Sequence, residues 1–360
     1  MAAPTIVDTN PSSQVSERPA EVPHTTVVED WVALAIGLWM IGGVFLDGYA
    51  HVFVIDTETE DFFTPWHGIL YGGYASLVAW VGLIGYRRRG PTPILQWFPP
   101  PYRLAALGLL MFAVGGIGDG IWHTLLGIEN GIDALLSPTH LLLFSGGVIA
   151  LWTPVRSSAA RGDTSPALAV GAVVLVTSVL LFFAHYLWMV PDTFYALEPF
   201  DPDRGIGNSR IQMFFGGAFS STAVLFGPLL IISRRWVLPF GAATVVLTTA
   251  VGLEALAFSH RLWPVFLAAV AGLAFDTTLV VSRRLGQPGI GKRLAAFAGP
   301  AALFSGYLLV AAAEDGPLGW PPEIWCGLVI LTGFAGVGLV LIQESGAGPD
   351  VAVPTAGGDR

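Results

Sequence analysis

Residues 324–342 read IWCGLVILTGFAGVGLVLI, a stretch without a single charged side chain. A helix of about 20 apolar residues crosses the roughly 30 Å hydrocarbon core of a bilayer, so this stretch predicts a membrane-spanning helix. The composition agrees, since hydrophobic residues make up 53% of the 360 positions and charged residues only 12%. Soluble domains carry about 25% charged residues. The sequence therefore predicts an integral membrane protein.

Nine more apolar stretches of similar length precede this one, so the predicted fold is all-α, a polytopic transmembrane bundle of about ten helices. Residues 1–28 and 346–360 lack an apolar pattern, and we expect both to be disordered tails around a bundle at 29–345. The predicted helices are residues 31–54, 66–86, 103–123, 138–155, 166–190, 210–233, 236–258, 262–282, 292–312 and 324–342.

Basic residues predict the orientation, because arginine and lysine collect in loops on the cytoplasmic side. They lie in alternate loops, which puts both termini in the cytoplasm and the acidic loops outside the cell membrane. The formal charge of -9 argues against nucleic acid as a partner. Membrane lipid and further subunits are the partners that we expect. The basic loops contain Arg87, Arg88 and Arg89; Arg156 and Arg161; Arg234 and Arg235; and Arg283, Arg284, Lys292 and Arg293.

One constellation of polar residues and glycines occurs twice and indicates an internal repeat, a duplicated helical hairpin at about 31–86 and 103–155. Each copy has an Asp-x3-His pair, a hydroxyl residue followed by proline, a second histidine and a glycine pair. The first copy is Asp47, His51, Thr64, Pro65, His67, Gly72 and Gly73, and the second is Asp119, His123, Ser137, Pro138, His140, Gly146 and Gly147.

The spacing within each copy favours a metal site. Aspartate and histidine four residues apart lie on one face of a helix. A Thr-Pro or Ser-Pro step caps the returning helix and leaves the second histidine in its first turn. The glycine pairs permit close helix contact. Two copies in the same orientation can face each other, which would gather up to four histidines and two aspartates around one cavity.

The ligand types limit the metal. Cys326 is the only cysteine, so thiolate sites are excluded and a metal must use nitrogen and oxygen. Such ligands suit zinc, copper(II), iron or manganese, and one or two ions would fit. The candidate metal ligands are Asp47, His51, His67, Asp119, His123, His140 and His260.

Three more residues near the predicted outer face bear on the site. His185 lies at the outer end of the fifth predicted helix, and Glu254 and His260 at that of the seventh. We expect Glu254 and His185 to be catalytic, as an additional ligand or a proton-transferring group. The alternative is structural, because a histidine at a helix C-terminus also complements the helix dipole.

These observations favour a membrane metalloprotein with an extracytoplasmic His/Asp site. We expect an enzyme, an oxidoreductase or hydrolase that acts on a lipid or small hydrophobic substrate through metal-activated water or oxygen. A transporter or metal permease is the first alternative, although transporters usually bind near the bilayer midplane and contain inverted repeats. The second is a subunit or assembly factor whose polar cluster only organises helices and binds no metal.

The Asp-x3-His element with a later histidine resembles the metal-binding pattern in the C subunit of copper-dependent membrane monooxygenases. That resemblance implies Asp47, His51 and His67 as one ligand set, and Asp119, His123 and His140 as another. The pattern is also similar to that of the seven-helix zinc hydrolases of the alkaline ceramidase and adiponectin-receptor type. As a whole, the chain resembles uncharacterised bacterial multi-pass membrane proteins that bear this repeat.

Overall fold

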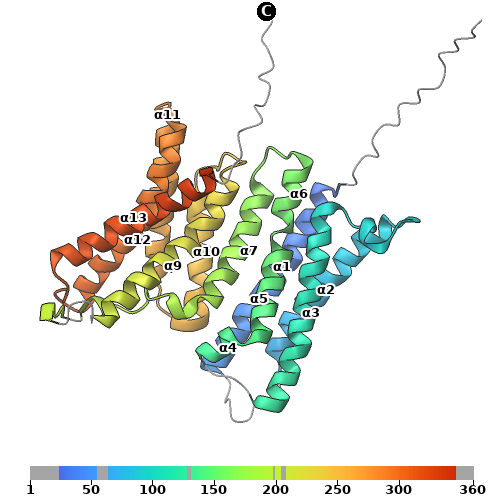
Figure 1. Cartoon of the computed structure of the whole chain (residues 1–360), viewed down its shortest axis with the longest axis horizontal. Coiled ribbons are helices and arrows are strands. Elements are labelled where there is room, and N and C mark those ends of the chain that lie inside the picture. Colours follow the sequence, from blue (N-terminus) through green and yellow to red (C-terminus); the bar gives the residue numbers. More distant parts are fainter. Residues whose placement is uncertain (1–23, 55–63, 128–130, 198, 204–207, 346–360) are drawn as a thin grey trace, which may run out of the picture.

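The structure, a computed structural model, describes residues 24–54, 64–127, 131–197, 199–203 and 208–345. Within these ranges the secondary structure is helical, without a strand, and the helices pack into one layered bundle (Figure 1). The predicted polytopic helix bundle is thus confirmed. Its elements are α1 (Val27–Phe53), α2 (Pro65–Arg87), η1 (Ile94–Trp97), α3 (Pro100–Leu126), α4 (Ile132–Leu136), α5 (Pro138–Leu151), α6 (Thr153–Arg161), α7 (Ala167–Phe183), η2 (His185–Leu187), α8 (Phe194–Leu197), α9 (Ser209–Ile232), α10 (Ala242–Glu254), η4 (Ala255–Ser259), α11 (Trp263–Arg284), α12 (Pro288–Glu314) and α13 (Pro322–Ser345).

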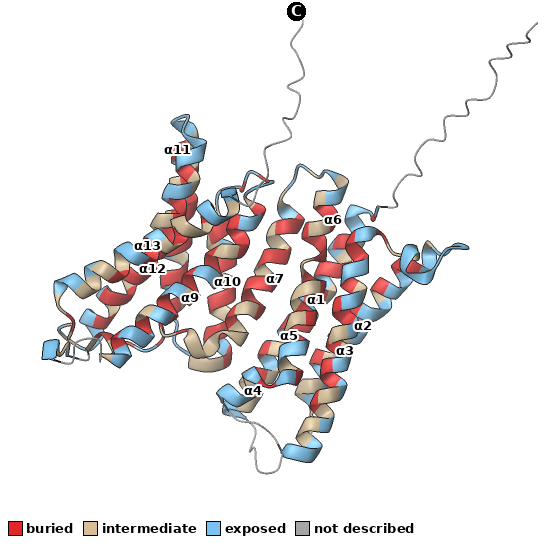
Figure 2. Ribbon diagram, viewed as in Figure 1, coloured by how far each residue is buried: buried red, intermediate tan, exposed pale blue. Residues whose placement is uncertain are grey.

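Nine helical segments of the described chain are long and apolar enough to cross a membrane. The shorter apolar helix α7, with 17 residues, corresponds to the remaining predicted crossing. Buried residues face neighbouring helices, whereas many large apolar side chains lie exposed on the outside of the bundle (Figure 2). This distribution suits a chain surrounded by lipid. The start of α1 and the end of α13 lie on one side, and α4 lies on the other, called here the α4 side (Figure 1).

Several helix ends differ from the predicted ones. The fifth helix, expected over 166–190, ends at Phe183, and His185 lies in the short 3-10 turn η2 that follows. The fourth, expected over 138–155, is α5 followed by α6, which begins where Pro154 would interrupt a continuous helix. The first helix begins at Val27 and not at 31, because Thr26 and Glu29 form a capping box. The predicted tails lie outside the described residues up to position 23 and from 346 on.

The seventh helix begins later than its apolar pattern suggests, at Ala242 and not at 236. Gly241 precedes it with a left-handed backbone (φ 93°). The carboxylate of Asp276, on α11, accepts hydrogen bonds from the backbone N–H groups of Ala243 and Thr244 at 3.1 and 3.0 Å. This helix start is therefore capped by a residue of a different helix.

Helices α1 and α2 form one closely packed hairpin, and α3 and α5 form another. In the first hairpin, Gly73 lies against the backbone of Met40, since a Cβ atom at Gly73 would be 2.7 Å from the Met40 Cα. In the second, a Cβ at Gly146 would be 2.4 Å from the carbonyl oxygen of Gly108 and 2.7 Å from the Phe112 nitrogen. Only glycine permits these approaches. The sequence predicted close contact for both glycines of each pair, and one glycine of each, Gly73 and Gly146, lies against the backbone of the other helix.

A second contact recurs in both hairpins, closer to the α4 side. A Cβ at Gly43 would be 2.6 Å from the Cα of Leu70, and a Cβ at Gly115 would be 2.9 Å from the backbone nitrogen of Leu143. Gly43 and Gly115 each precede the aspartate of their copy by four residues. The two hairpins therefore hold their polar ends by glycine contacts at matching sequence positions.

Buried polar groups tie the helices together on the side away from α4. Asp30, on α1, has no solvent exposure and accepts hydrogen bonds from the Tyr102 hydroxyl at 2.7 Å and the Arg161 guanidinium at 2.5 Å. Arg161 also pairs with Asp163 at 2.6 Å. This network joins α1, α3 and α6 and fixes the frame from which the two hairpins extend.

Candidate metal centre

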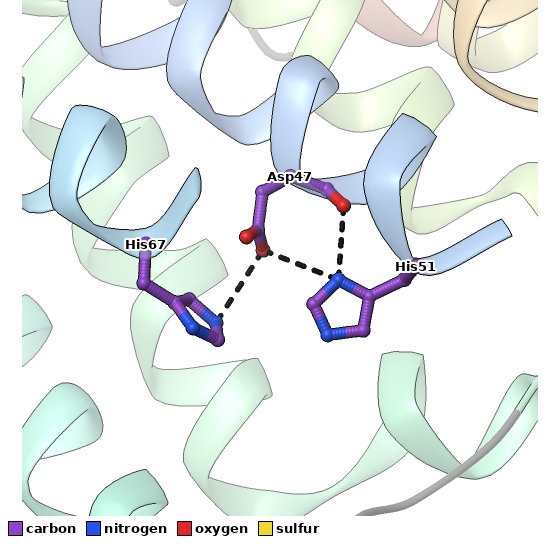
Figure 3. Close-up of side chains that lie close together, drawn as sticks. All are labelled: Asp47, His51 and His67. Carbon is purple, nitrogen blue, oxygen red and sulfur yellow. Dashed lines mark hydrogen bonds and ion pairs between the residues drawn. The ribbon is translucent and has the colours of Figure 1, made fainter. Parts of the chain in front are cut away.

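The first group of polar residues lies where α1 ends and α2 begins. Asp47 and His51 are one turn apart on α1, and His67 is in the first turn of α2. Their side chains point toward one another (Figure 3). The His67 Nε2 atom is 3.5 Å from Asp47 Oδ2, and the His51 Nδ1 atom is 3.9 Å from the same oxygen.

The second group has the same origin in the other hairpin. Asp119 and His123 lie one turn apart near the end of α3, and His140 lies in the first turn of α5. The His123 Nε2 atom is 3.4 Å from Asp119 Oδ2, and the His140 Nδ1 atom is 3.5 Å from Asp119 Oδ1. Asp119 is more buried than its counterpart, with side-chain exposures of 2% against 16% for Asp47.

Helix caps orient the second histidine of each group. The Thr64 hydroxyl accepts the backbone N–H of His67 and lies 3.1 Å from the Nδ1 atom of the same residue. The Ser137 hydroxyl does the same for His140, with Oγ and Nδ1 2.7 Å apart. One hydroxyl thus begins the helix and holds the imidazole ring.

Backbone carbonyls orient the first histidine of each group. The His51 Nδ1 atom donates to the Asp47 carbonyl at 2.9 Å, and the His123 Nδ1 atom lies 3.4 Å from the Gly127 carbonyl. Metal-bound histidines usually donate their other ring nitrogen to such a group, which fixes the tautomer and the ring direction. This arrangement directs Nε2 of both rings to a ligand role.

The separations within each group fit a bound metal ion. One possible ligand atom from each residue lies within 4.8 Å of the others in both groups. Imidazole nitrogen and carboxylate oxygen bind zinc at about 2.0–2.2 Å, so a tetrahedral ion would hold two of them about 3.3–3.6 Å apart. The distances of 3.4 Å for His123–Asp119 and 3.5 Å for His67–Asp47 match that separation.

Both groups open on one cavity of 480 Å³ on the α4 side. Its walls also contain Tyr71, Phe112, Phe144 and Phe258, so the polar residues share the space with aromatic rings. The cavity accordingly combines two Asp-His-His groups with largely apolar, aromatic walls. All six residues of the two groups line it, namely Asp47, His51, His67, Asp119, His123 and His140.

A further polar pair, His185 of η2 and Glu254 of α10, places the histidine ring in the wall of the same cavity. The His185 Nδ1 atom donates to the Glu254 Oε1 atom at 2.9 Å, and the His185 ring, which lines the cavity, stacks on Phe258 with centroids 4.1 Å apart. Glu254 is fully buried at the end of α10, where the π-helical segment η4 begins. A carboxylate that holds one ring nitrogen in this way leaves the other ring nitrogen to act on a ligand or a proton.

His260, also predicted as a ligand, lies outside both groups. It follows η4 with a left-handed backbone (φ 55°), and its ring packs on Phe53 with centroids 4.2 Å apart and on Tyr49 at 5.7 Å. Those contacts join His260 to the last two turns of α1. A ligand role for His260 stays a prediction.

Two residues of the site, Thr139 and Tyr71, were not predicted from the sequence. Thr139 donates to the Asp119 carboxylate at 3.1 Å, and Tyr71 lies in the cavity wall with its hydroxyl next to Gly116 of α3. Both contacts join residues of different helices. A polar residue directly after the Ser-Pro step was the one available hint for Thr139, since the first copy has Trp66 at that position.

Comparisons with protein-family models, with curated proteins and with solved structures give no match to this chain. The resemblance to the copper-dependent monooxygenase subunit stays a prediction from the two motifs alone, Asp47, His51 and His67 and Asp119, His123 and His140.

Proposed function

We propose that this chain is a membrane metalloenzyme whose two Asp-His-His groups bind transition-metal ions in one extracytoplasmic cavity. The observation that carries the proposal is the convergence of both groups, from separate hairpins, on the same 480 Å³ space. Ionisable residues within membrane segments are energetically expensive and are usually retained for function. Two such groups with ligand-like spacing are more than a structural role requires.

The donor set favours zinc, copper(II), iron or manganese, because it contains only nitrogen and oxygen. A metal ion bound here would act as a Lewis acid and lower the pKa of a coordinated water molecule. The aromatic walls suit a lipid or a small hydrophobic substrate. Hydrolase and oxidoreductase chemistry are both compatible with this donor set.

His185 and Glu254 supply the proton-transferring group in this proposal. The buried Glu254 carboxylate holds His185 Nδ1 at 2.9 Å and so orients the ring toward the cavity. An imidazole oriented by a carboxylate is the usual arrangement of a general base. His185 would therefore accept a proton from a bound nucleophile and return it to the leaving group.

The position of the two groups argues against the transporter or permease. Transporters commonly bind their cargo near the bilayer midplane at interrupted helices. Here the aspartates and histidines occupy the last two turns of α1 and α3 and the first turn of α2 and α5. The two groups themselves thus lie at the α4 end of the cavity, which extends from there to Met40 in the middle of α1.

The two hairpins are, in this view, copies of one ancestral unit. Support comes from the matching glycine contacts of Gly43 with Leu70 and of Gly115 with Leu143. The cell membrane is the proposed location, with the metal groups outside, because Arg87, Arg161, Arg283 and Arg284 lie at the ends of α2, α6 and α11, away from the α4 side. Further subunits could complete the site.

The test is elemental analysis of protein purified in mild detergent without chelator, beside the double variants His51→Ala/His67→Ala and His123→Ala/His140→Ala. We expect roughly one metal ion fewer per disrupted group. His24→Ala, at a histidine before α1, is the matched control and should retain the full content. His185→Gln should also retain it, because a proton-transferring role leaves the metal in place.

Wild-type protein that stays metal-free after reconstitution with zinc, copper, iron and manganese would refute the proposal. The histidines would then be an interfacial structural network. Full metal content in both double variants would refute the assignment of the ligands.

A further inference from the structure

A second hollow lies between α2 and α3, on the outside of the metal cavity. It encloses 680 Å³ and is lined by two tyrosines of α2, Tyr71 and Tyr74, and by small and aliphatic residues of α3. Ile117 and Ile121 on its α3 wall are 68% and 55% exposed. Because these helices cross the membrane, the groove opens toward lipid.

Tyr71 belongs to both spaces and, among the residues described, is the one shared by their linings. A Cβ atom at Gly116 would lie 3.0 Å from the Tyr71 hydroxyl, so the side chain crosses from α2 to the surface of α3. Its ring also lies edge-on to Phe112, with centroids 6.4 Å apart. The Tyr71 side chain thus borders both the groove and the metal cavity.

The groove surface is apolar even where it contains hydroxyl groups. The Tyr74 hydroxyl donates to the Leu109 carbonyl at 2.8 Å, and the Thr124 hydroxyl donates to the Gly120 carbonyl at 2.7 Å. Both donors are therefore used by the backbone. A hydrocarbon can contact this surface without the desolvation of a polar group.

The groove favours a thin, flexible occupant over another helix. Gly116 and Gly120 have the small-xxx-small spacing that lets two membrane helices approach closely. Tyr71 of the same chain already covers Gly116, however, which keeps a second backbone away. An alkyl chain can instead follow the groove past the tyrosines, held by packing contacts.

We propose that the groove between α2 and α3 seats the alkyl chain of a lipid, with the chain's polar end beside Tyr71 and the metal cavity. This inference rests on the proposed function and names its substrate class as long-chain lipids that enter laterally from the bilayer. A fatty acid and a phospholipid offer the same chain, and separate probes distinguish these two sources.

The test uses full-length protein in vesicles of phosphatidylcholine that contain either a diazirine-labelled fatty acid or a diazirine-labelled phosphatidylcholine. After photolysis, labelled positions are mapped by mass spectrometry. We expect adducts concentrated on the α3 wall at Ile117 and Ile121. Ile117→Trp should abolish them by filling the groove, whereas Leu110→Trp, at a 61% exposed position of α3 outside the groove, should leave them unchanged.

Labelling by either probe alone identifies the source and supports the alkyl-chain site. Labelling of Leu110 as strong as that of Ile117, or adducts that persist in Ile117→Trp, would overturn the inference. Absence of adducts on α3 with both probes would also overturn it. Metal content, measured in the same samples, separates this failure from failure of the proposed function.

Discussion

Thr139 is the residue whose removal most sharply tests how the second metal group is held. Its hydroxyl donates to Asp119 Oδ1 at 3.1 Å, and Asp119 is only 2% exposed, so water has little access to replace the lost hydrogen bond. Thr139→Val keeps the shape of the side chain and removes the donor. Loss of a group that orients a metal ligand lowers metal affinity about 10–100-fold, equivalent to ~1.4–2.8 kcal/mol.

The affinity is best measured for one group at a time. In a His51→Ala/His67→Ala background only the second group remains, and zinc affinity can be determined in detergent by competition with a chromophoric chelator. We expect Thr139→Val to raise the zinc Kd of this background about 10–100-fold. Because Asp119 is nearly inaccessible to solvent, the effect should fall in the upper part of that range.

Trp66 provides the matched control, since it occupies the corresponding position after Thr64-Pro65 in the first hairpin. Trp66→Phe, in the His123→Ala/His140→Ala background, removes its N–H donor and should leave the zinc affinity of the first group unchanged. An unaltered Kd in Thr139→Val would refute the reasoning. So would a loss that also occurred in Trp66→Phe.

Two predictions concern the frame. Gly146→Ala forces α3 and α5 apart, because the new Cβ would be 2.4 Å from the Gly108 carbonyl oxygen. We expect it to destabilise the protein by about 1–3 kcal/mol, measured by thermal unfolding followed by circular dichroism. Gly42→Ala is the control, since a Cβ there would have nothing within 4 Å, and equal melting temperatures of the two variants would contradict the close contact. The Arg161 guanidinium, hydrogen-bonded to the Asp163 carboxylate, lowers the pKa of Asp163 in the folded protein below its unfolded value of ~3.9. The pair therefore stabilises the fold fully above pH ~3.9, and this stabilisation is lost as the pH falls through the lower pKa of the folded state. Asp163→Asn should therefore lower stability by at most ~1 kcal/mol at pH 7 and weaken its acid dependence, and an unchanged pH profile of the melting temperature would argue against the pair.

The helices were predictable because a membrane span has a simple requirement of length and apolar composition. Helix ends that depend on local caps were partly accessible, and Thr64 and Ser137 begin α2 and α5 as their sequences indicated. The start of α10 was not accessible, because its cap is Asp276 of another helix. The early end of α7 likewise has no local stop signal in the sequence.

The candidate metal groups followed from the same local rules, since four-residue spacing and helix caps fix where Asp, His and His point. Thr139 and Tyr71 could not be found in that way, because their partners are defined by packing between helices. Likewise, His185 and Glu254 were proposed only from their common membrane depth, whereas their 2.9 Å contact depends on how η2 lies against α10. The local pattern thus predicted the two candidate metal groups, whereas the residues around them depend on the tertiary structure.

In each hairpin one hydroxyl, of Thr64 or Ser137, both caps the helix and contacts the histidine ring, and this limits where the hairpins tolerate insertions and deletions. The interval from capping residue to histidine is three residues in both copies, whereas the segment from the first histidine to the cap is one residue longer in the second hairpin. The two copies thus differ in length only in the segment between the first histidine and the capping residue. Epitope tags or reporter peptides inserted there should leave the ligand geometry intact, but a single residue inserted between Ser137 and His140 would rotate the histidine by about 100° around the helix axis.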